Sequence, residues 1–134
     1  MVTLAVVDTH ALIWYAGQRW QKLGREARRV FEEVDAGNGA IFVPALVMVE
    51  FGEAVRRGEV KLVEDTLAFG RRLFSTNRFI PVDLTWEIVQ RAEELLVIPE
   101  RGDRLIAATA MELDYPLITR DPEIAAAAGL ELIW

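Results

Sequence analysis

The sequence contains no cysteine and a single histidine among its 134 residues. Without cysteine, disulfides, thiolate nucleophiles and cysteine-ligated zinc are excluded. Long hydrophobic runs are also missing, since none approaches the ~20 residues that cross a bilayer. The first eight residues, Met1 to Asp8, lack the charged region and small-residue cleavage site of a signal peptide. From these absences we expect a cytoplasmic protein without a membrane segment.

Positive charge is scarce as well. The chain carries 21 acidic and 15 basic side chains, for a net charge of −6. The basic field typical of nucleic-acid-binding proteins is therefore absent from the chain as a whole, which counts against that class. A hydrophobic fraction of 52% with 27% charged residues is typical of a globular chain rather than a disordered one. The length fits one domain, and we expect residues 1–134 to form it.

Short apolar runs alternate with segments of helical periodicity along the whole chain. Strands alternating with helices predict a three-layer α/β/α sandwich around a short, mostly parallel sheet. Strands are expected over 3–8, 40–43, 79–82, 117–119 and 130–134, and helices over 11–17, 23–34, 44–57, 63–74, from Thr85 to Pro99, 103–114 and 122–128.

Four carboxylates adjoin these apolar segments. Asp8 and Asp121 come just after expected strands, Asp103 falls in the first turn of a helix, and Glu50 lies within an apolar helical stretch. In a parallel sheet, ligands bind outside the carboxyl ends of the strands. Carboxylates beside a core are costly unless paired or bound to a cation. Each of the three aspartates could instead cap a helix or complement its dipole, so only the combination indicates a metal site.

Together these segments resemble a PIN domain, and within that family the VapC-type toxins of prokaryotic toxin–antitoxin pairs. The resemblance extends over essentially the whole chain, because four weak motifs occur in family order. The motifs are Val7-Asp8-Thr9-His10-Ala11-Leu12-Ile13-Trp14, Glu50 after a strand, Gly102-Asp103-Arg104-Leu105-Ile106-Ala107-Ala108 and Leu117-Ile118-Thr119-Arg120-Asp121.

The resemblance implies a PIN-like fold and a Mg²⁺- or Mn²⁺-dependent endoribonuclease. It also implies an RNA substrate, a homodimer and a cognate antitoxin protein. Carried over residue by residue, it makes Asp8, Glu50, Asp103 and Asp121 catalytic, with Asp8, Asp103 and Asp121 holding the metal. Thr119 would support this site through a hydrogen bond. Oxygen ligands suit Mg²⁺ or Mn²⁺, but the sequence does not decide between one ion and two.

Two arginines and one glutamate near these positions have open roles. Arg104 and Arg120 each adjoin a catalytic candidate, and could hold RNA phosphates or form ion pairs with the acids. Close relatives often carry His-Asp-Pro-Phe-Asp-Arg where this chain has Pro99-Glu100-Arg101-Gly102-Asp103-Arg104. Asp103 is kept, whereas the role of Glu100 stays open.

The aromatic residues and the histidine are interpreted structurally. His10 is expected to serve the core or a cap beside Asp8 rather than a metal. Trp14, Trp86 and Trp134 lie in apolar segments and are expected in the core or a dimer interface. Trp20, beside Arg19 and Lys22, is the one tryptophan expected to be exposed and able to stack on a base.

Other function classes fit less well. A haloacid-dehalogenase-like phosphatase needs a second aspartate two residues after Asp8, where this chain has His10. No Gly-x-Gly-x-x-Gly follows a strand, which excludes the usual dinucleotide fingerprint. A catalytically silent PIN module, and a DNA-cleaving or RNA-processing PIN nuclease, remain alternatives. No residue pattern identifies a reader of the RNA 2′-hydroxyl.

Overall fold

A five-stranded, wholly parallel sheet forms the centre of the computed structural model, which describes residues 2–134. The strand order is β3-β2-β1-β4-β5. The expected α/β/α sandwich is therefore confirmed, with no antiparallel strand among the described residues. The strands are β1 (Thr3–Val7), β2 (Gly39–Pro44), β3 (Phe79–Val82), β4 (Leu117–Ile118) and β5 (Leu132–Ile133).

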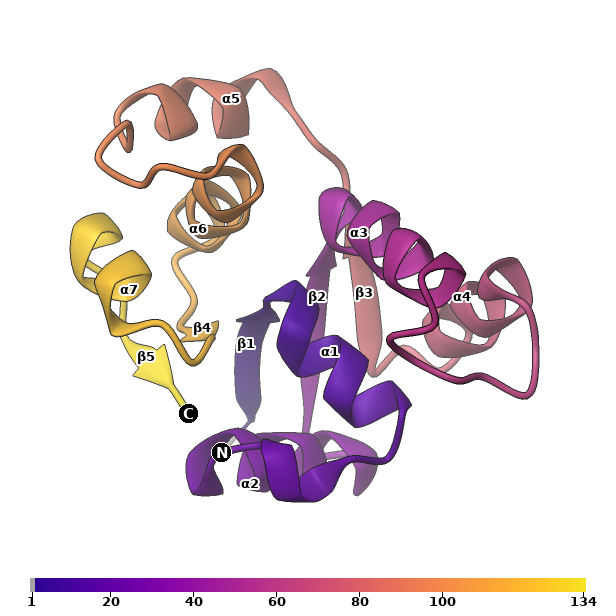
Figure 1. Ribbon diagram of the computed structural model, residues 1–134. Helices are drawn as coiled ribbons and strands as arrows, with labels where there is room; N and C mark the ends of the chain where they lie inside the picture. Colours follow the sequence, from indigo (N-terminus) through magenta and orange to yellow (C-terminus); the bar gives the residue numbers. More distant parts are fainter. Residues whose placement is uncertain (1) are drawn as a thin grey trace.

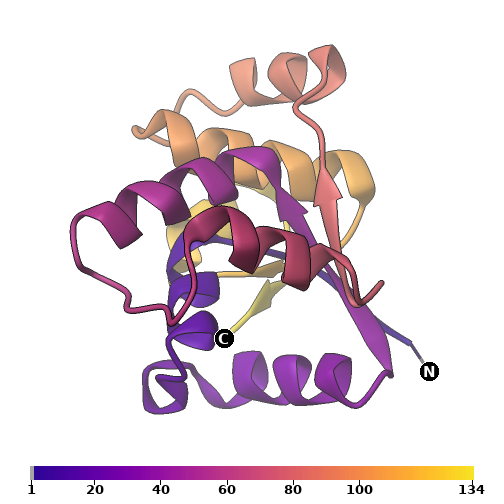
Figure 2. The ribbon, with the colours of Figure 1, turned by 90° about the vertical axis from the view of Figure 1, so that its right-hand side faces the viewer.

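Seven α-helices and one 3₁₀ turn connect the strands within residues 2–134. In Figure 1, α2 lies below the strands, α3 and α4 lie on the side of β3, and α6 and α7 lie on the side of β4 and β5; Figure 2 shows the same arrangement from the right-hand side. Helical crossovers let these parallel neighbours pair, because a parallel pair cannot be joined by a tight turn. The helices are α1 (Thr9–Ala16), α2 (Arg25–Asp35), α3 (Ala45–Arg56), α4 (Thr66–Phe74), α5 (Trp86–Glu93), α6 (Arg101–Leu113) and α7 (Pro122–Ala128), and the 3₁₀ turn is η1 (Trp20–Lys22).

The core lies where β1, β2 and β4 meet the helices. Val6 and Val7 on β1, Ile41 on β2 and Leu117 on β4 are fully buried. Strands covered on both faces need continuous aliphatic runs, which explains why these short segments are almost purely Val, Ile, Leu and Ala. The parallel register pairs Val6 with both Phe42 and Leu117, so β1 is the central strand.

The order in which successive strands are added to the sheet reverses beside β1. The chain passes from β1 to β2 and β3 on one side, then returns to place β4 and β5 on the other. The carboxyl ends of β1 and β4 therefore flank a topological switch point. Open α/β sheets form their ligand crevices at such points.

Two expectations from the sequence about helix boundaries are wrong. The helix expected from residue 63 begins at Thr66, where Asp65 caps it, and both Val63 and Leu67 are exposed. Its buried face is Phe69, Gly70 and Leu73.

The second error concerns the α5 region. The helix expected to run from Thr85 to Pro99 ends already at Glu93, and Leu96, which lies beyond that end, is 63% exposed. Trp86, at the first turn of α5, is 68% exposed and is not a core residue, while its role at a dimer interface stays a prediction.

No helix among residues 2–134 is both long and apolar enough to cross a membrane.

Candidate active site

Asp8 lies at the carboxyl end of β1 and begins α1. Its side chain accepts a hydrogen bond from the Ala11 backbone N–H at 2.9 Å, so it is the N-cap of α1. The same partly buried carboxyl lines a cavity of about 490 Å³, the main cavity. The capping role is therefore confirmed, and the same side chain also faces the cavity where a site would lie.

Asp121 and Thr119 follow β4 on the other side of the switch point. The Asp121 side chain accepts from the Glu123 N–H at 2.9 Å and caps α7, whose first residue is Pro122. Thr119 is 1% exposed, and its hydroxyl accepts from the Asp121 N–H at 3.2 Å. Both residues line the same cavity as Asp8.

Asp103 and Glu50 come from the helices α6 and α3. Asp103 lies in the first turn of α6, where the helix dipole favours a negative charge. The Glu50 carboxylate accepts a hydrogen bond from the Thr9 hydroxyl. Glu50 does not line the main cavity but an adjoining one of about 150 Å³, which shares Asp8, His10, Glu100 and Asp103 with it.

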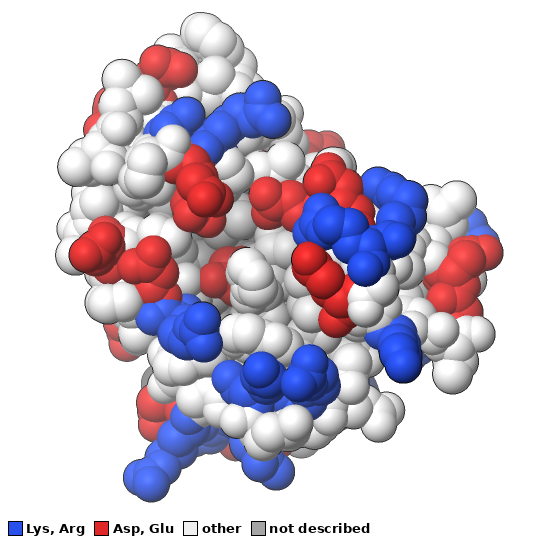
Figure 3. Space-filling model, in the orientation of Figure 1, with Lys and Arg blue, Asp and Glu red and all other residues white. Residues whose placement is uncertain are grey.

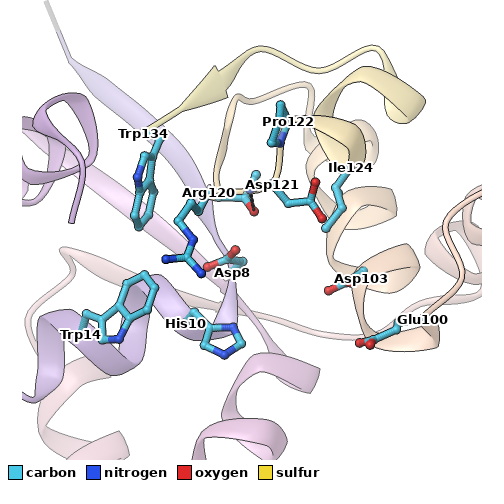
Figure 4. Close-up of a pocket in the computed structure, with 11 residues that line it drawn as sticks. Asp8, His10, Trp14, Glu100, Asp103, Arg120, Asp121, Pro122, Ile124 and Trp134 are labelled. Atoms are coloured by element: carbon cyan, nitrogen blue, oxygen red, sulfur yellow. Dashed lines mark hydrogen bonds between the residues drawn. The ribbon is translucent and has the colours of Figure 1, made fainter. Parts of the chain in front are cut away.

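Acidic side chains therefore surround a common hollow, and basic side chains lie outside them (Figure 3). The close-up shows Asp8, Asp103, Asp121 and Glu100 around the main cavity (Figure 4). As they stand, no three carboxylate or histidine side chains among residues 2–134 are arranged to hold one metal ion. Hydrogen bonds to backbone N–H groups hold the side chains of Asp8 and Asp121 at the N-termini of α1 and α7.

The charge in this hollow is poorly compensated. Burial raises the pKa of Asp103 to about 6, and the negative charges of Glu100, Asp8, Glu50 and Asp121 add to the rise. Burial also raises the pKa of Asp8, an effect partly offset by the Ala11 amide and the Thr119 hydroxyl. Both shifts mean that the ionised carboxylates are destabilised in the fold.

Neither neighbouring arginine neutralises these acids. Among residues 2–134, no Lys or Arg nitrogen lies within 4.0 Å of the carboxylates of Asp8, Glu50, Asp103 or Asp121. Arg104 donates instead to the carbonyl oxygens of Ile98 and Pro99, at 2.7 and 2.9 Å. Arg120 lines the main cavity with its guanidinium over the Trp14 ring.

The PIN domain family model matches residues 5–130 of the sequence. The chain belongs to the PIN domain family. No curated protein matches it in sequence.

Solved structures resemble this PIN domain in fold. A chain of the VapBC2 complex from Rickettsia felis, bound to a promoter DNA fragment, superposes with a TM-score of 0.71 at 18% identity over 97% of each chain. FitAcB from Neisseria gonorrhoeae gives a TM-score of 0.65 at 14% identity, covering 97% of this chain and 96% of that one. A toxin–antitoxin complex from Klebsiella pneumoniae gives 0.63 at 22% identity, with 91% and 90% covered.

The donor chemistry of this PIN domain fits a hard divalent cation. Its candidate ligands are carboxylate oxygens, which suit Mg²⁺ or Mn²⁺. Mg²⁺ keeps several waters and is usually bound through one or two carboxylates, so three converging side chains are not required. The pKa values of Asp8 and Asp103 are raised, and no basic side chain lies nearby to lower them. A carboxylate site that binds a cation has this character before the charge of the cation is added.

Thr9 and Gly102 belong to this arrangement, and sequence reasoning missed both. Thr9 holds Glu50 through its hydroxyl, and a Cβ added at Gly102 would lie 2.5 Å from the Glu50 Oε2 atom. Gly102 thus leaves the space that the carboxylate occupies. The available signals were a hydroxyl residue directly after Asp8 and a glycine in the first turn of a helix, where glycine is unfavourable.

The structure also changes the interpretation of His10 and three tryptophans. His10 is exposed and lines both cavities, so it does not serve the core. Trp20 is half-buried against Tyr15 and Phe31, and is not the exposed tryptophan that was expected. Trp14 and Trp134 are half-buried and line the main cavity.

We expect divalent cations to stabilise the fold in a pH-dependent way. Because the pKa of Asp103 is raised to about 6 from 3.8, the folded state holds a proton between these values that the unfolded state has lost. The metal-free fold should therefore lose stability as the pH rises from 3.8 through about 6. Mn²⁺ must displace this proton, so it should stabilise the fold more at about pH 7.5 than at about pH 5.

Thermal unfolding with Mn²⁺ and with EDTA at both pH values measures this effect. At a Mn²⁺ concentration 100 times the Kd, the gain at the higher pH should be about 2.7 kcal/mol. A gain that is equal or larger at the lower pH would contradict the assignment of Asp103 to the cation site.

Proposed function

We propose that this PIN domain, over residues 1–134, is a Mg²⁺- or Mn²⁺-dependent endoribonuclease and the toxin of a toxin–antitoxin pair. The observation that carries the proposal is the shared hollow at the switch point of the sheet. Asp8, Asp103 and Asp121 face it, Glu50 adjoins it, and no basic side chain of residues 2–134 neutralises them. Family membership and the toxin–antitoxin origin of similar folds support the same conclusion.

In this proposal Asp8, Asp103 and Asp121 hold the cation. When bound, Mg²⁺ or Mn²⁺ lowers the pKa of water and polarises the phosphoryl oxygens of the substrate. Asp8 is the anchor, since its capping bond fixes the side chain at the centre of the crevice. Thr119 supports Asp8 and Asp121 from the buried side through its hydroxyl.

Glu50 is proposed to orient the attacking water and accept its proton. Its carboxylate is held by the Thr9 hydroxyl and lies against Gly102, next to Asp103 in the sequence. A carboxylate fixed from two sides can receive a proton at a defined position, which is the geometric requirement for a general base. The pair Thr9 and Gly102 is thus a positioning device for Glu50.

Of the two arginines, Arg120 is the better candidate for a phosphate contact. It lines the cavity and has no carboxylate partner within the described residues, so its N–H groups are available to an anion. Arg104 uses the same guanidinium nitrogen for the Ile98 and Pro99 carbonyls, which favours a structural role at the start of α6.

Cleavage of unlabelled RNA and DNA strands of matched sequence tests the proposal. Purified protein should cut single-stranded RNA in Mn²⁺ or Mg²⁺, stop cutting in EDTA, and resume when the metal is restored. Metal-dependent cutting of the DNA strand alone would favour the DNA-cleaving alternative. Absence of cutting on either strand, with Mn²⁺ bound, would favour a catalytically silent PIN module.

The proposal includes a homodimer and a cognate antitoxin as partners. Similar folds come from VapBC2 and from a toxin–antitoxin complex, which supports an antitoxin for this chain as well. Large exposed apolar side chains near α5, namely Leu84, Leu96 and Val97, support a protein–protein interface on this domain.

A further inference from the structure

The main cavity has a second wall that the hydrolytic site does not use. Across the cavity from Asp103 and Glu100, the side chains of Trp14 and Trp134 lie next to the Arg120 guanidinium (Figure 4). The two indole rings meet edge to face with centroids 5.7 Å apart. The His10 ring lies 5.7 Å from Trp14 on the side of Asp8. Acidic oxygen atoms and aromatic surface therefore share one cavity.

The Trp134 ring is held in place by its backbone. The Glu26 N–H donates to the Trp134 carbonyl oxygen at 3.1 Å, and the Thr119 N–H donates to the Ile133 carbonyl oxygen at 3.2 Å. A Cβ at Gly24 would lie 2.6 Å from the Trp134 Cδ1 atom, so the ring packs directly on the start of α2. A ring fixed from both sides loses little entropy when a ligand stacks on it.

Arg120 supplies a positive charge between the wall and the acids. Its Cζ atom lies 5.3 Å from the Trp14 ring centroid, in cation–π range. Since Arg120 follows the buried Thr119 and precedes the capping Asp121, its backbone is fixed by β4 and α7. A substrate phosphate bound by Arg120 would lie next to the acidic side chains of the cavity. The base of the same nucleotide would then point toward the Trp14 and Trp134 rings.

We infer that Trp14, Trp134 and Arg120 form a nucleotide subsite, in which a base of the substrate stacks on the indole rings while Arg120 binds the adjoining phosphate. The cavity, at about 490 Å³, lies within the 300–1,000 Å³ range of small-ligand sites. A base in an intact duplex cannot reach these rings, because both of its faces are already stacked. The inference rests on the proposed function and narrows its substrate to single-stranded RNA or to unpaired loops.

Binding of an end-labelled single-stranded RNA, measured by fluorescence anisotropy in Mg²⁺, tests the subsite. An Asp8→Asn background prevents cleavage in every variant. Trp134→Ala should weaken binding about 5- to 100-fold, the range of one base–aromatic stack. Trp134→Phe should restore most of the affinity, and Leu67→Ala, which truncates an exposed side chain on α4, should leave it unchanged.

A scan with abasic nucleotides separates stacking from a merely structural effect. Removing the base at one position of the RNA should weaken binding to the parent protein by a similar factor. The same abasic RNA should bind Trp134→Ala no worse than intact RNA does, because the ring that the base met is already gone. Circular dichroism checks that each variant is folded.

The inference is overturned if no abasic position weakens RNA binding to the parent protein. It is also overturned if, at every position, the abasic RNA loses as much affinity for Trp134→Ala as it loses for the parent. If Trp134→Ala does not fold, the parent scan and the Trp134→Phe variant decide alone. Failure of the wild-type protein to cleave RNA in Mn²⁺ would instead overturn the proposed function. RNA cleavage together with a flat abasic scan would overturn the subsite only.

Discussion

Replacement of Asp8 by Asn should lower Mn²⁺-dependent RNA cleavage by at least about 1,000-fold, because it removes one carboxylate oxygen from the centre of the site. The fold should survive the change. Asn caps helices as well as Asp does, and its side-chain oxygen can still accept from the Ala11 N–H. Burial raises the pKa of Asp8, which means that the ionised carboxylate costs stability in the fold. Its replacement by a neutral amide should therefore leave the free energy of unfolding unchanged or slightly higher.

The measurement is the rate of RNA cleavage at saturating Mn²⁺, accompanied by thermal unfolding of both proteins. Asp65→Asn is the matched control, because Asp65 caps α4 through the Ala68 N–H at 2.7 Å but lines neither acidic cavity. This variant makes the same chemical change at the same kind of position and should keep full activity. Undiminished cleavage by folded Asp8→Asn protein would remove Asp8 from the mechanism.

Replacement of Gly102 by Ala should separate activity from stability. The added Cβ would lie 2.5 Å from the Glu50 Oε2 atom, so the carboxylate has to move away from the Thr9 hydroxyl. A displacement of about 1 Å in a positioning group can cost about 100-fold in rate, and we expect kcat/KM to fall by about 10- to 100-fold. Stability should stay level or rise by up to about 1 kcal/mol, since Ala is the better helix former.

Gly70→Ala in α4 is the control for this experiment. A Cβ there would meet only the Met48 Cε atom, at an ordinary 3.6 Å, and Gly70 lines neither of the two acidic cavities. It should show the gain in helix stability with no change in cleavage. If Gly102→Ala cleaves RNA as fast as the wild type, Glu50 is either not held at this place or not needed there.

Much of the fold follows from local sequence. The strands β1 and β2 could be predicted because Leu4 to Val7 and Ala40 to Val43 are short, unbroken apolar runs, as is typical of strands covered on both faces. The start of α4 could not be predicted in the same way. Val63 and Leu67 fit the apolar period, but the cap at Asp65 and the packing of Phe69 set a different phase.

The candidate site, too, could be predicted from the sequence only in part. Asp8 and Asp121 were predictable as neighbours, because both follow parallel strands and such strands end at one edge of a sheet. The roles of Thr9 and Gly102 depend on how closely α3 approaches the start of α6, which no local pattern encodes. The aromatic wall likewise arises only when β5 pairs beside β4 and brings Trp134 to Arg120.

The account depends on a divalent cation binding among Asp8, Asp103 and Asp121. Calorimetric titration of the metal-free wild-type and Asp8→Asn proteins with Mn²⁺, at about pH 7.5 where Asp103 is ionised, measures this directly. The wild type should bind Mn²⁺ saturably, and the variant should bind it at least about ten times more weakly, as for loss of a ligand. Equal binding by both proteins, or no binding by either, would contradict the cation site.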